Sequence, residues 1–328
     1  MSTTRSNEVF NNTTLALFEA LSKISDPRKK RGVRHNVHSI LKLVILGFCS
    51  RLVCLEHIVE FATHCWESIK GPLGFTRNRP PDATTIGRVL KRIDREELEE
   101  IFREWVSSKV YGKEIDASVD GKALRNVCDE KGNPIYMVNV FAHDVQMVLA
   151  QEEIPEKKGE STTFRSMLEG LFNKYPGLRL LTGDAAFNGR DLCKEIARLG
   201  KHYLVQIKGN QKQVYKILQL HFDEEKQDRA PDAKSVEKKV SEKTIVRELW
   251  ICNGFTVDYI RENLNYPAFL QVGYLRKRTY LKNSLISQEH HYGVTSCSKS
   301  ELSPEKFMDK TRKHWEIENG LHHVKNRS

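Results

Sequence analysis

The chain has 328 residues, of which 39% are hydrophobic and 29% are charged. This composition excludes a largely disordered protein and provides enough apolar residues for more than one domain. Lys and Arg exceed Asp and Glu by 10, which favours a polyanionic partner such as nucleic acid, although a solvated basic surface explains the same excess.

Cysteine usage and hydropathy indicate the compartment. The seven cysteines are scattered and form no CxxC pair, which excludes a disulfide framework and a zinc ribbon. The first residues, MSTTRSNEVFNN, lack the apolar core of a signal peptide. The most apolar stretch, ILKLVILGFCSRLVCL, is interrupted by Lys42 and Arg51 and is too short to span a bilayer. We therefore expect a cytoplasmic protein.

Residues 1–105 read as a compact helical domain. Apolar residues recur at spacings of three and four between Ile40 and Cys65, and PPDATTIGRVLKRID begins a helix with Asp82 or Thr84 as its cap. In front of these helices, DPRKKRGVRH carries six basic side chains in ten residues if its histidine is counted. This segment is either a solvated loop or an arm that contacts phosphates.

From about Glu114 the pattern changes to short strands. EIDASVDG, PIYMVNVFAH and QMVLAQEEI predict a three-stranded meander. A helix in STTFRSMLEGLFNKY, a strand in RLLTGDA, a helix in RDLCKEIARLG and a strand in HYLVQIKG follow. This order predicts a mixed α/β fold, with a mixed sheet that carries helices on its faces.

The α/β pattern is then interrupted before a last helix. Residues 221–240 are highly charged and read as a loop or linker, and three strand-like segments follow, TIVRELWICN, AFLQVGYLRKR and HHYGVTS. We place this β-rich insertion at about residues 227–295. The last helix begins near Ser303 and Pro304 and runs through FMDKTRKHWEIENGLHHVKN.

Three carboxylates are candidates for chemistry. Asp120 closes the first predicted strand and Asp184 closes the fourth, so the two converge if these strands are neighbours. Glu318 lies on the last helix, on the same face as Lys325. Three converging carboxylates need a counter-charge, which two Mg²⁺ ions, or Mn²⁺ in their place, provide in phosphodiester chemistry. Turn capping by Asp120 or Asp184 is the alternative explanation.

Four segments, taken in order, resemble the insertion-sequence DDE transposases of the H-repeat-associated branch. They are DGKALRN, LTGDAAFNGRDLC, VQIKGNQ and HWEIENGLHHVK. The N-terminal DPRKKRGVRHNVHSILKL and PPDATTIGRVLKRID resemble the helical domain that accompanies that branch. The resemblance implies an N-terminal transposase-associated, DNA-binding domain over residues 1–105. It also implies a ribonuclease-H-like catalytic domain over residues 106–328.

The resemblance also implies roles for the candidate carboxylates. Asp120 would bridge two metal ions, and Asp184 and Glu318 would each complete one of them. The separations are 64 and 134 residues, and the β-rich insertion fills the second gap. One position departs from the wider pattern, because the arginine four residues before the glutamate is replaced here by His314, and the nearest arginine is Arg312.

Several basic and polar residues are expected to contact DNA. Lys325 and Tyr292 resemble signature residues of the family, while the others are singled out by charge and position. A plain loop explains Lys208 and Asn210 equally well. The complete set is Lys325, Lys122, Arg125, Tyr292, Lys208, Asn210, Arg28, Arg31 and Arg34.

The function that follows from the resemblance is metal-dependent cleavage of DNA at insertion-sequence ends and strand transfer into target DNA. The expected partners are double-stranded DNA, as terminal inverted repeats and target, and a second copy of the chain in the DNA complex. We expect the protein on the nucleoid of a prokaryote. The alternatives are a metal-dependent nuclease that never joins ends, and an inactive DNA-binding remnant that is truncated at Ser328.

Overall fold

The computed structural model describes residues 15–29, 31–128, 131–155, 159–225, 229–239, 242–252, 254–264 and 269–325. At residues 125–127, 224–225 and 315–325 it describes the backbone alone. The chain divides into two compact units, with the boundary between Lys109 and Val110. No helix in the described ranges is both long and apolar enough to cross a membrane.

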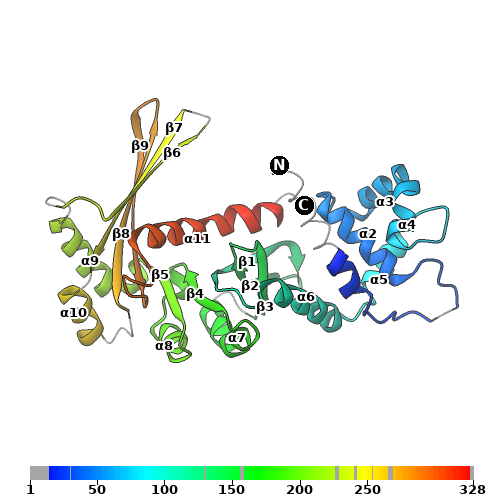
Figure 1. The fold of residues 1–328 in the computed structure, drawn as a ribbon, viewed down its shortest axis with the longest axis horizontal. Coiled ribbons are helices and arrows are strands. Elements are labelled where there is room, and N and C mark those ends of the chain that lie inside the picture. Colours follow the sequence, from blue (N-terminus) through cyan, green and yellow to red (C-terminus); the bar gives the residue numbers. More distant parts are fainter. Residues whose placement is uncertain are drawn as a thin grey trace. The chain divides into compact units, whose positions relative to one another are not determined.

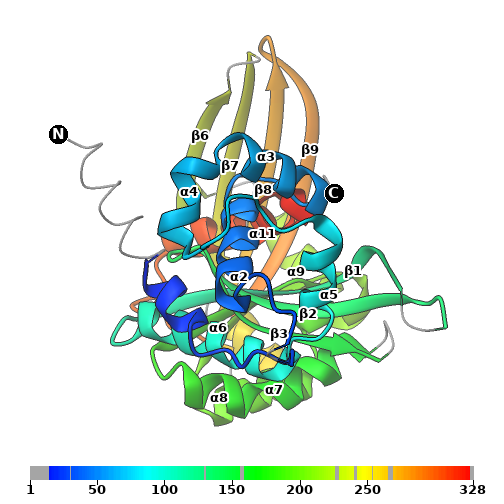
Figure 2. The ribbon, with the colours of Figure 1, turned by 90° about the vertical axis from the view of Figure 1, so that its right-hand side faces the viewer.

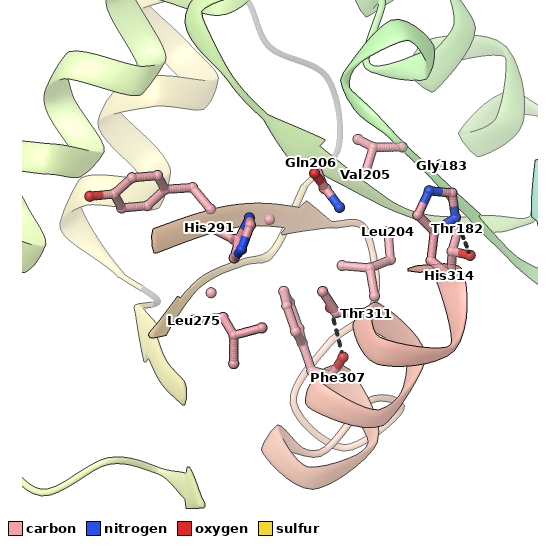
Figure 3. Close-up of a pocket in the computed structure, with 13 residues that line it drawn as sticks. Thr182, Gly183, Leu204, Val205, Gln206, Leu275, His291, Phe307, Thr311 and His314 are labelled. Carbon is pink, nitrogen blue, oxygen red and sulfur yellow. Dashed lines mark hydrogen bonds between the residues drawn. The ribbon is translucent and has the colours of Figure 1, made fainter. Parts of the chain in front are cut away.

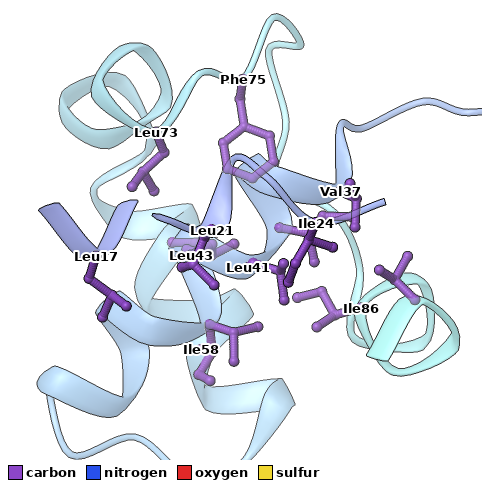
Figure 4. Packing of buried hydrophobic residues seen from close by; sticks show 14 of the residues in the cluster. Leu17, Leu21, Ile24, Val37, Leu41, Leu43, Ile58, Leu73, Phe75 and Ile86 are labelled. Carbon is purple, nitrogen blue, oxygen red and sulfur yellow. The ribbon is translucent and has the colours of Figure 1, made fainter. Parts of the chain in front are cut away.

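The first unit is helical. Its main helices are α2 (Val37–Cys49), α3 (Leu55–His64), α4 (Trp66–Leu73), α5 (Ala83–Leu90) and α6 (Arg95–Val110). The buried faces of these helices and of the segment 15–21 meet in one core, in which Leu21, Ile40 and Ile58 have no exposed surface (Figure 4). Asp82 caps α5 by accepting a hydrogen bond from the Thr85 amide, as one of the two predicted caps.

The second unit is built on a mixed sheet of nine strands. The order across the sheet is β3-β2-β1-β4-β5-β9-β8-β7-β6. Strands β1, β2 and β3 pair antiparallel, while β4 and β5 run parallel to β1 (Figures 1 and 2). This arrangement confirms the expected mixed α/β fold with a mixed sheet. The bounds are β1 (Ile115–Cys128), β2 (Pro134–Ala142), β3 (Met147–Ile154), β4 (Leu178–Gly183), β5 (His202–Ile207), β6 (Ala233–Lys239), β7 (Lys243–Cys252), β8 (Gln271–Leu281) and β9 (Ser284–Thr295).

Helices cover both faces of this sheet. Helices α7 (Glu160–Lys174) and α8 (Arg190–Arg198) lie on one face, and α11 (Pro304–Lys325) crosses the other (Figure 1). Alternation along β1 assigns the faces, because Gly121 faces Glu160 of α7 whereas Asp116 pairs with Lys310 of α11. Because side chains alternate between the two faces, Asp116, Ser118 and Asp120 all lie on the face that α11 crosses.

The charged stretch at 221–240 corrects the expectation of a loop. Its first residues end α9 (Lys212–Glu225), and residues 233–239 form β6, which pairs with β7 along its whole length. A further helix, α10 (Phe255–Asn263), was also not predicted. Strand β6 lies at the edge of the sheet, where exposed lysines replace the apolar alternation by which buried strands are identified.

Candidate active site

The sheet brings Asp120 and Asp184 side by side. In the parallel pair β1–β4, Val119 is the partner of Gly183, so each aspartate follows directly after the same rung of the ladder. Neighbouring strands are about 4.8 Å apart. Both carboxylates act on the pKa of His314 in α11, raising it against the effect of burial, which places both of them near that ring. The two acids thus face one region beneath α11.

The position of Asp120 differs from the prediction in one respect. It does not end β1, because the strand continues to Cys128 and Asp120 pairs with Asn139 of β2. However, the pairing of β1 with β4 ends at the rung before it. From Asp120 onward, β1 is no longer paired with β4, so the backbone at the two carboxylates is not held in a ladder between these strands.

Asp184 performs the capping role that was the alternative explanation, and it retains capacity beyond that role. One of its oxygens, Oδ1, accepts a 2.8 Å hydrogen bond from the Ala186 amide at the start of a short helical turn, Ala185–Phe187. Among the described residues, its other oxygen has no hydrogen-bond partner. Capping and metal binding are therefore compatible at this residue.

Helix α11 is seated on the sheet by Phe307. The ring enters a gap left by two paired glycines, Gly273 of β8 and Gly293 of β9. A Cβ atom at Gly273 would lie 2.6 Å from Cζ of Phe307. The ring is only 2% exposed, and Figure 3 shows it entering the pocket near Leu204 and Leu275. The absence of two side chains in the sheet therefore sets the height at which α11 crosses it.

Two turns further along α11, His314 joins a buried chain of polar side chains. Its Nδ1 atom lies 3.4 Å from the Thr182 hydroxyl in β4 (Figure 3). That hydroxyl lies 2.7 Å from the Ser118 hydroxyl in β1, which in turn lies 2.7 Å from Nε2 of His143. Burial lowers the pKa of both rings, that of His143 to about 4. The chain therefore ties α11 to β1 and β4 with neutral imidazoles.

Ion pairs hold the same helix to the rim of the sheet. Lys310 lies 2.8 Å from the Asp116 carboxylate, which also receives Arg179 at 3.3 Å. Lys310 and Lys313 both reach Asp144, in the turn between β2 and β3. Since the Asp116 and Lys310 side chains are 12% and 15% exposed, this pair is shielded from most of the solvent.

The loops after β4 and β5 are joined by an amide cluster. The Asn210 side-chain amide donates hydrogen bonds to the Ala185 carbonyl, at 2.6 Å, and to Asn188 Oδ1, at 3.1 Å. Asn188 is buried and donates 2.7 Å to the Gln206 carbonyl. This network assigns Asn210 to holding the loop that follows Asp184. Lys208, two residues before Asn210, is exposed, and its positive charge helps to lower the pKa of His314.

The other residues expected at DNA are placed unevenly. Tyr292 is 4% exposed and packs among Tyr215, Phe222 and Tyr274, and burial raises its pKa. We assign it to the packing of the sheet, because a ring covered in this way has no surface for DNA. Lys122 follows Asp120 by two positions and shares its side of β1 by alternation.

Three predicted side chains lie outside the described part of the chain, namely those of Arg125, Glu318 and Lys325. The backbone of α11 is described through Lys325, so position 318 lies one helical turn beyond His314. Within the described residues, no three His, Cys, Asp or Glu side chains form a metal-binding group.

In the first unit, the predicted arginines divide into two kinds. Arg28 forms a two-bond pair with Asp26, at 2.8 and 2.7 Å, and donates to the His35 carbonyl, so it stabilises its own loop. Arg31 and Arg34 are exposed and line a groove of that unit.

A cavity of about 20 Å³ lies between β4, β5, β8, β9 and α11, and it is lined by Gly183, Gln206 and His291 among others. This volume holds about one water molecule.

Comparisons with known proteins agree with this architecture. The family described as transposase DDE domain matches residues 118–327, and the one described as DDE_Tnp_1-associated matches residues 18–106. The "H repeat-associated putative transposase YhhI" of Escherichia coli is 26% identical over 312 residues, which cover 93% of this chain and 81% of that protein. An uncharacterized protein in the dhlA 3′ region of Xanthobacter autotrophicus is 26% identical over 285 residues, 83% of this chain and 92% of that one. Among solved structures, the piggyBac transposase synaptic complex with hairpin DNA aligns with a TM-score of 0.41 and 10% identity, over 93% of this chain and 66% of that chain.

Proposed function

The chain belongs to the transposase DDE domain family, and from this premise we propose that it cuts DNA at the ends of an insertion sequence and joins the freed ends to target DNA. The observation that carries the proposal is the pairing of Val119 with Gly183, which sets Asp120 and Asp184 next to each other where the pairing of β1 with β4 ends. The attacking oxygen is that of water in the first step and of the freed 3′-hydroxyl in the second.

The path of α11 supports Glu318 as the third acid. Phe307 lies over β8 and β9, and seven residues later His314 lies against Thr182 of β4. The next strand in the sheet is β1, about 4.8 Å further on. One more turn of helix advances about 6 Å and reaches position 318. The helix thus brings that position over the strand that carries Asp120.

The donor set fits a hard divalent cation. Asp120, Asp184 and Glu318 offer carboxylate oxygens, and the ring that lies nearest, His314, is buried and neutral and cannot balance them. Asp120, Asp184 and Glu318 would hold such ions through these oxygens. Two Mg²⁺ ions, or Mn²⁺, supply the charge that activates the attacking oxygen and stabilises the leaving one.

The remaining groups of the site keep these carboxylates in place. The chain from His143 through Ser118 and Thr182 to His314 fixes the helix against β1 and β4.

In the hydrolytic step, a bond from water to phosphorus forms, the bond from phosphorus to the 3′-oxygen breaks, and that oxygen leaves as a hydroxyl. In the joining step, the same hydroxyl forms a bond to a target phosphorus, the bond from that phosphorus to the target's 3′-oxygen breaks, and that oxygen leaves as a hydroxyl.

Nicking of supercoiled plasmid by the purified protein, in buffer with Mn²⁺ or Mg²⁺, tests the catalytic assignment. Asp120→Asn and Asp184→Asn should each lower the nicking rate at least 100-fold. Asp191→Asn is the matched control, because this exposed aspartate lies in α8, on the face of the sheet opposite α11. Equal activity in wild type and Asp120→Asn would refute the assignment.

A joining assay distinguishes a transposase from a nuclease. A labelled duplex that ends in a free 3′-hydroxyl is incubated with plasmid and protein, and the transfer of label to the plasmid is measured. Label on the plasmid that is lost in Asp184→Asn supports strand transfer, and nicking without transfer indicates a nuclease. Because two ends must be cut together, two copies of the chain are expected in the DNA complex.

A further inference from the structure

The helical first unit contains a groove that the catalytic proposal does not use. Three segments line it, namely residues 27–29 with 31–35, residues 76–80, and α5 together with its cap and the turn that follows it. We call it the arginine groove. Its cations are Arg28, Lys29, Arg31, Arg34, Arg77, Arg79, Arg88 and Arg92.

Positive charge is concentrated in this groove rather than spread over the unit. The described residues of this unit, 15–29 and 31–109, include sixteen Lys and Arg and twelve Asp and Glu. Eight of those cations line the groove, with Asp82 as the one acidic residue among its lining residues. Outside the groove, eight described cations are opposed by eleven described carboxylates. The rest of the described part of the unit therefore carries a net negative charge, and its basic character resides in the groove.

The acidic residue of the groove offsets only one of its eight positive charges. Asp82 accepts hydrogen bonds from the Thr85 amide and from the hydroxyls of Thr84 and Thr85 at the start of α5. These bonds lower the pKa of Asp82 to about 2. Asp82 is thus an ionised cap of α5, and the lining keeps an excess of seven positive charges for a ligand.

Two of the arginines build the groove and the others are left to bind. Arg28 holds the loop through Asp26 and the His35 carbonyl, and Arg77 donates 3.2 Å to the Arg34 carbonyl, which joins the first segment to the second. The cations that form no ion pair among the described residues are Lys29, Arg31, Arg34, Arg79, Arg88 and Arg92. Such unpaired guanidinium groups, held on a fixed frame, match the bidentate recognition of phosphate oxygens.

We propose that the arginine groove binds the sugar-phosphate backbone of double-stranded DNA. The choice of DNA over another polyanion rests on the proposed function, whereas the groove itself is independent of it. The absence of Phe, Tyr and Trp from the lining residues favours a duplex, because single strands are bound by stacking of their bases on aromatic rings. The groove would hold the DNA that the second unit cuts.

The salt dependence of binding tests this proposal. A variant with Arg31→Gln, Arg79→Gln and Arg88→Gln removes one exposed cation from each of the three segments. Log affinity falls with log salt, and each lost phosphate contact reduces the steepness of that fall by about 0.9. The magnitude of the slope should therefore decrease by about 2.7. Binding of a labelled 30-base-pair duplex is measured by fluorescence anisotropy between 50 and 200 mM KCl.

Matched controls separate local contact from total charge. A variant with Arg51→Gln, Arg95→Gln and Arg103→Gln has the same net charge, and these three arginines lie in the same unit outside the groove. Its slope should stay within 0.5 of wild type. Replacing the three groove arginines by lysine keeps the charge, and it should restore most of the slope if phosphate is the ligand. Circular dichroism of each variant verifies the helical fold.

The outcomes separate this proposal from the catalytic one. An unchanged slope in the groove variant, or an equal fall in the control variant, overturns the arginine groove whatever the nicking result. A fall confined to the groove variant supports it. If Asp120→Asn then nicks plasmid as fast as wild type, the catalytic proposal fails while the groove proposal stands.

Discussion

Substitution of Gly273 by alanine tests how the sheet positions α11. An alanine Cβ at this site would lie 2.6 Å from Cζ and 2.7 Å from Cε1 of Phe307. Carbon atoms pack at about 3.5–4.0 Å, so the ring has to move by about 1 Å. It cannot swing aside, since it is 2% exposed within a packed cluster that contains Leu249. Overpacking of this kind costs about 1–3 kcal/mol.

The directly paired Gly293 provides the control. An alanine Cβ at this site would lie 3.2 Å from the same Cζ atom and 3.6 Å from Leu204, which requires a shift of only a few tenths of an ångström. We expect Gly293→Ala to cost less than about 1 kcal/mol. The double variant Gly273→Ala with Phe307→Leu should recover part of the loss, because the shorter side chain removes the contact.

Two readouts are needed because the helix also carries position 318. Urea denaturation, followed by amide hydrogen exchange in β8 and β9, measures the free energy of unfolding of the sheet. Plasmid nicking measures the placement of α11, and a displacement of about 1 Å in a catalytic group can cost about 100-fold in rate. Gly273→Ala with the stability and nicking rate of wild type would refute the inference that this glycine sets the height of the helix.

Two further predictions concern the groups that hold α11. Asp116→Asn should lower the free energy of unfolding by about 1–3 kcal/mol, because it leaves the largely buried Lys310 and Arg179 without their shared acceptor. Asp144→Asn, measured by the same urea denaturation, should lower it by less than about 1 kcal/mol. Equal losses in the two variants would contradict this prediction. His143 has a folded pKa of about 4, below its usual 6.5, so the unfolded state binds a proton first as the pH falls. Stability should therefore decline between about pH 6.5 and pH 4, and His143→Gln should remove part of that decline in denaturation curves recorded at both pH values; an unaltered pH dependence would contradict it.

Local patterns in the sequence were sufficient for much of the fold. Alternation predicted β1, β2 and β3, and spacings of three and four predicted α7, with Phe164, Leu168 and Leu171 buried as expected. The order of the elements predicted the mixed sheet, and the motifs around Asp120 and Asp184 predicted the family that the comparisons then showed. These features are readable because each depends on neighbours within a few positions of the chain.

Other features were not readable from local patterns. Strand β6 is paired because β7 lies beside it, although its exposed face is lysine-rich. Asp120 was expected at a strand end, whereas β1 continues past it and only the pairing with β4 ends there. Tyr292 matched a signature position, yet packing against β8 and α9 buries it. In each case, residues distant in sequence decide the outcome.

The sequence by itself determined the residue types, the order of the elements and the family, because hydrophobic period and motif order are properties of one chain read in one direction. Only the tertiary structure decided which side chains meet. It joined His143 and His314 through two hydroxyls, opened the gap of Gly273 and Gly293 for Phe307, and gathered arginines from three segments into one groove. These contacts depend on strand register and helix crossing, which arise from packing over the whole sheet or helical core and not from any short stretch of sequence.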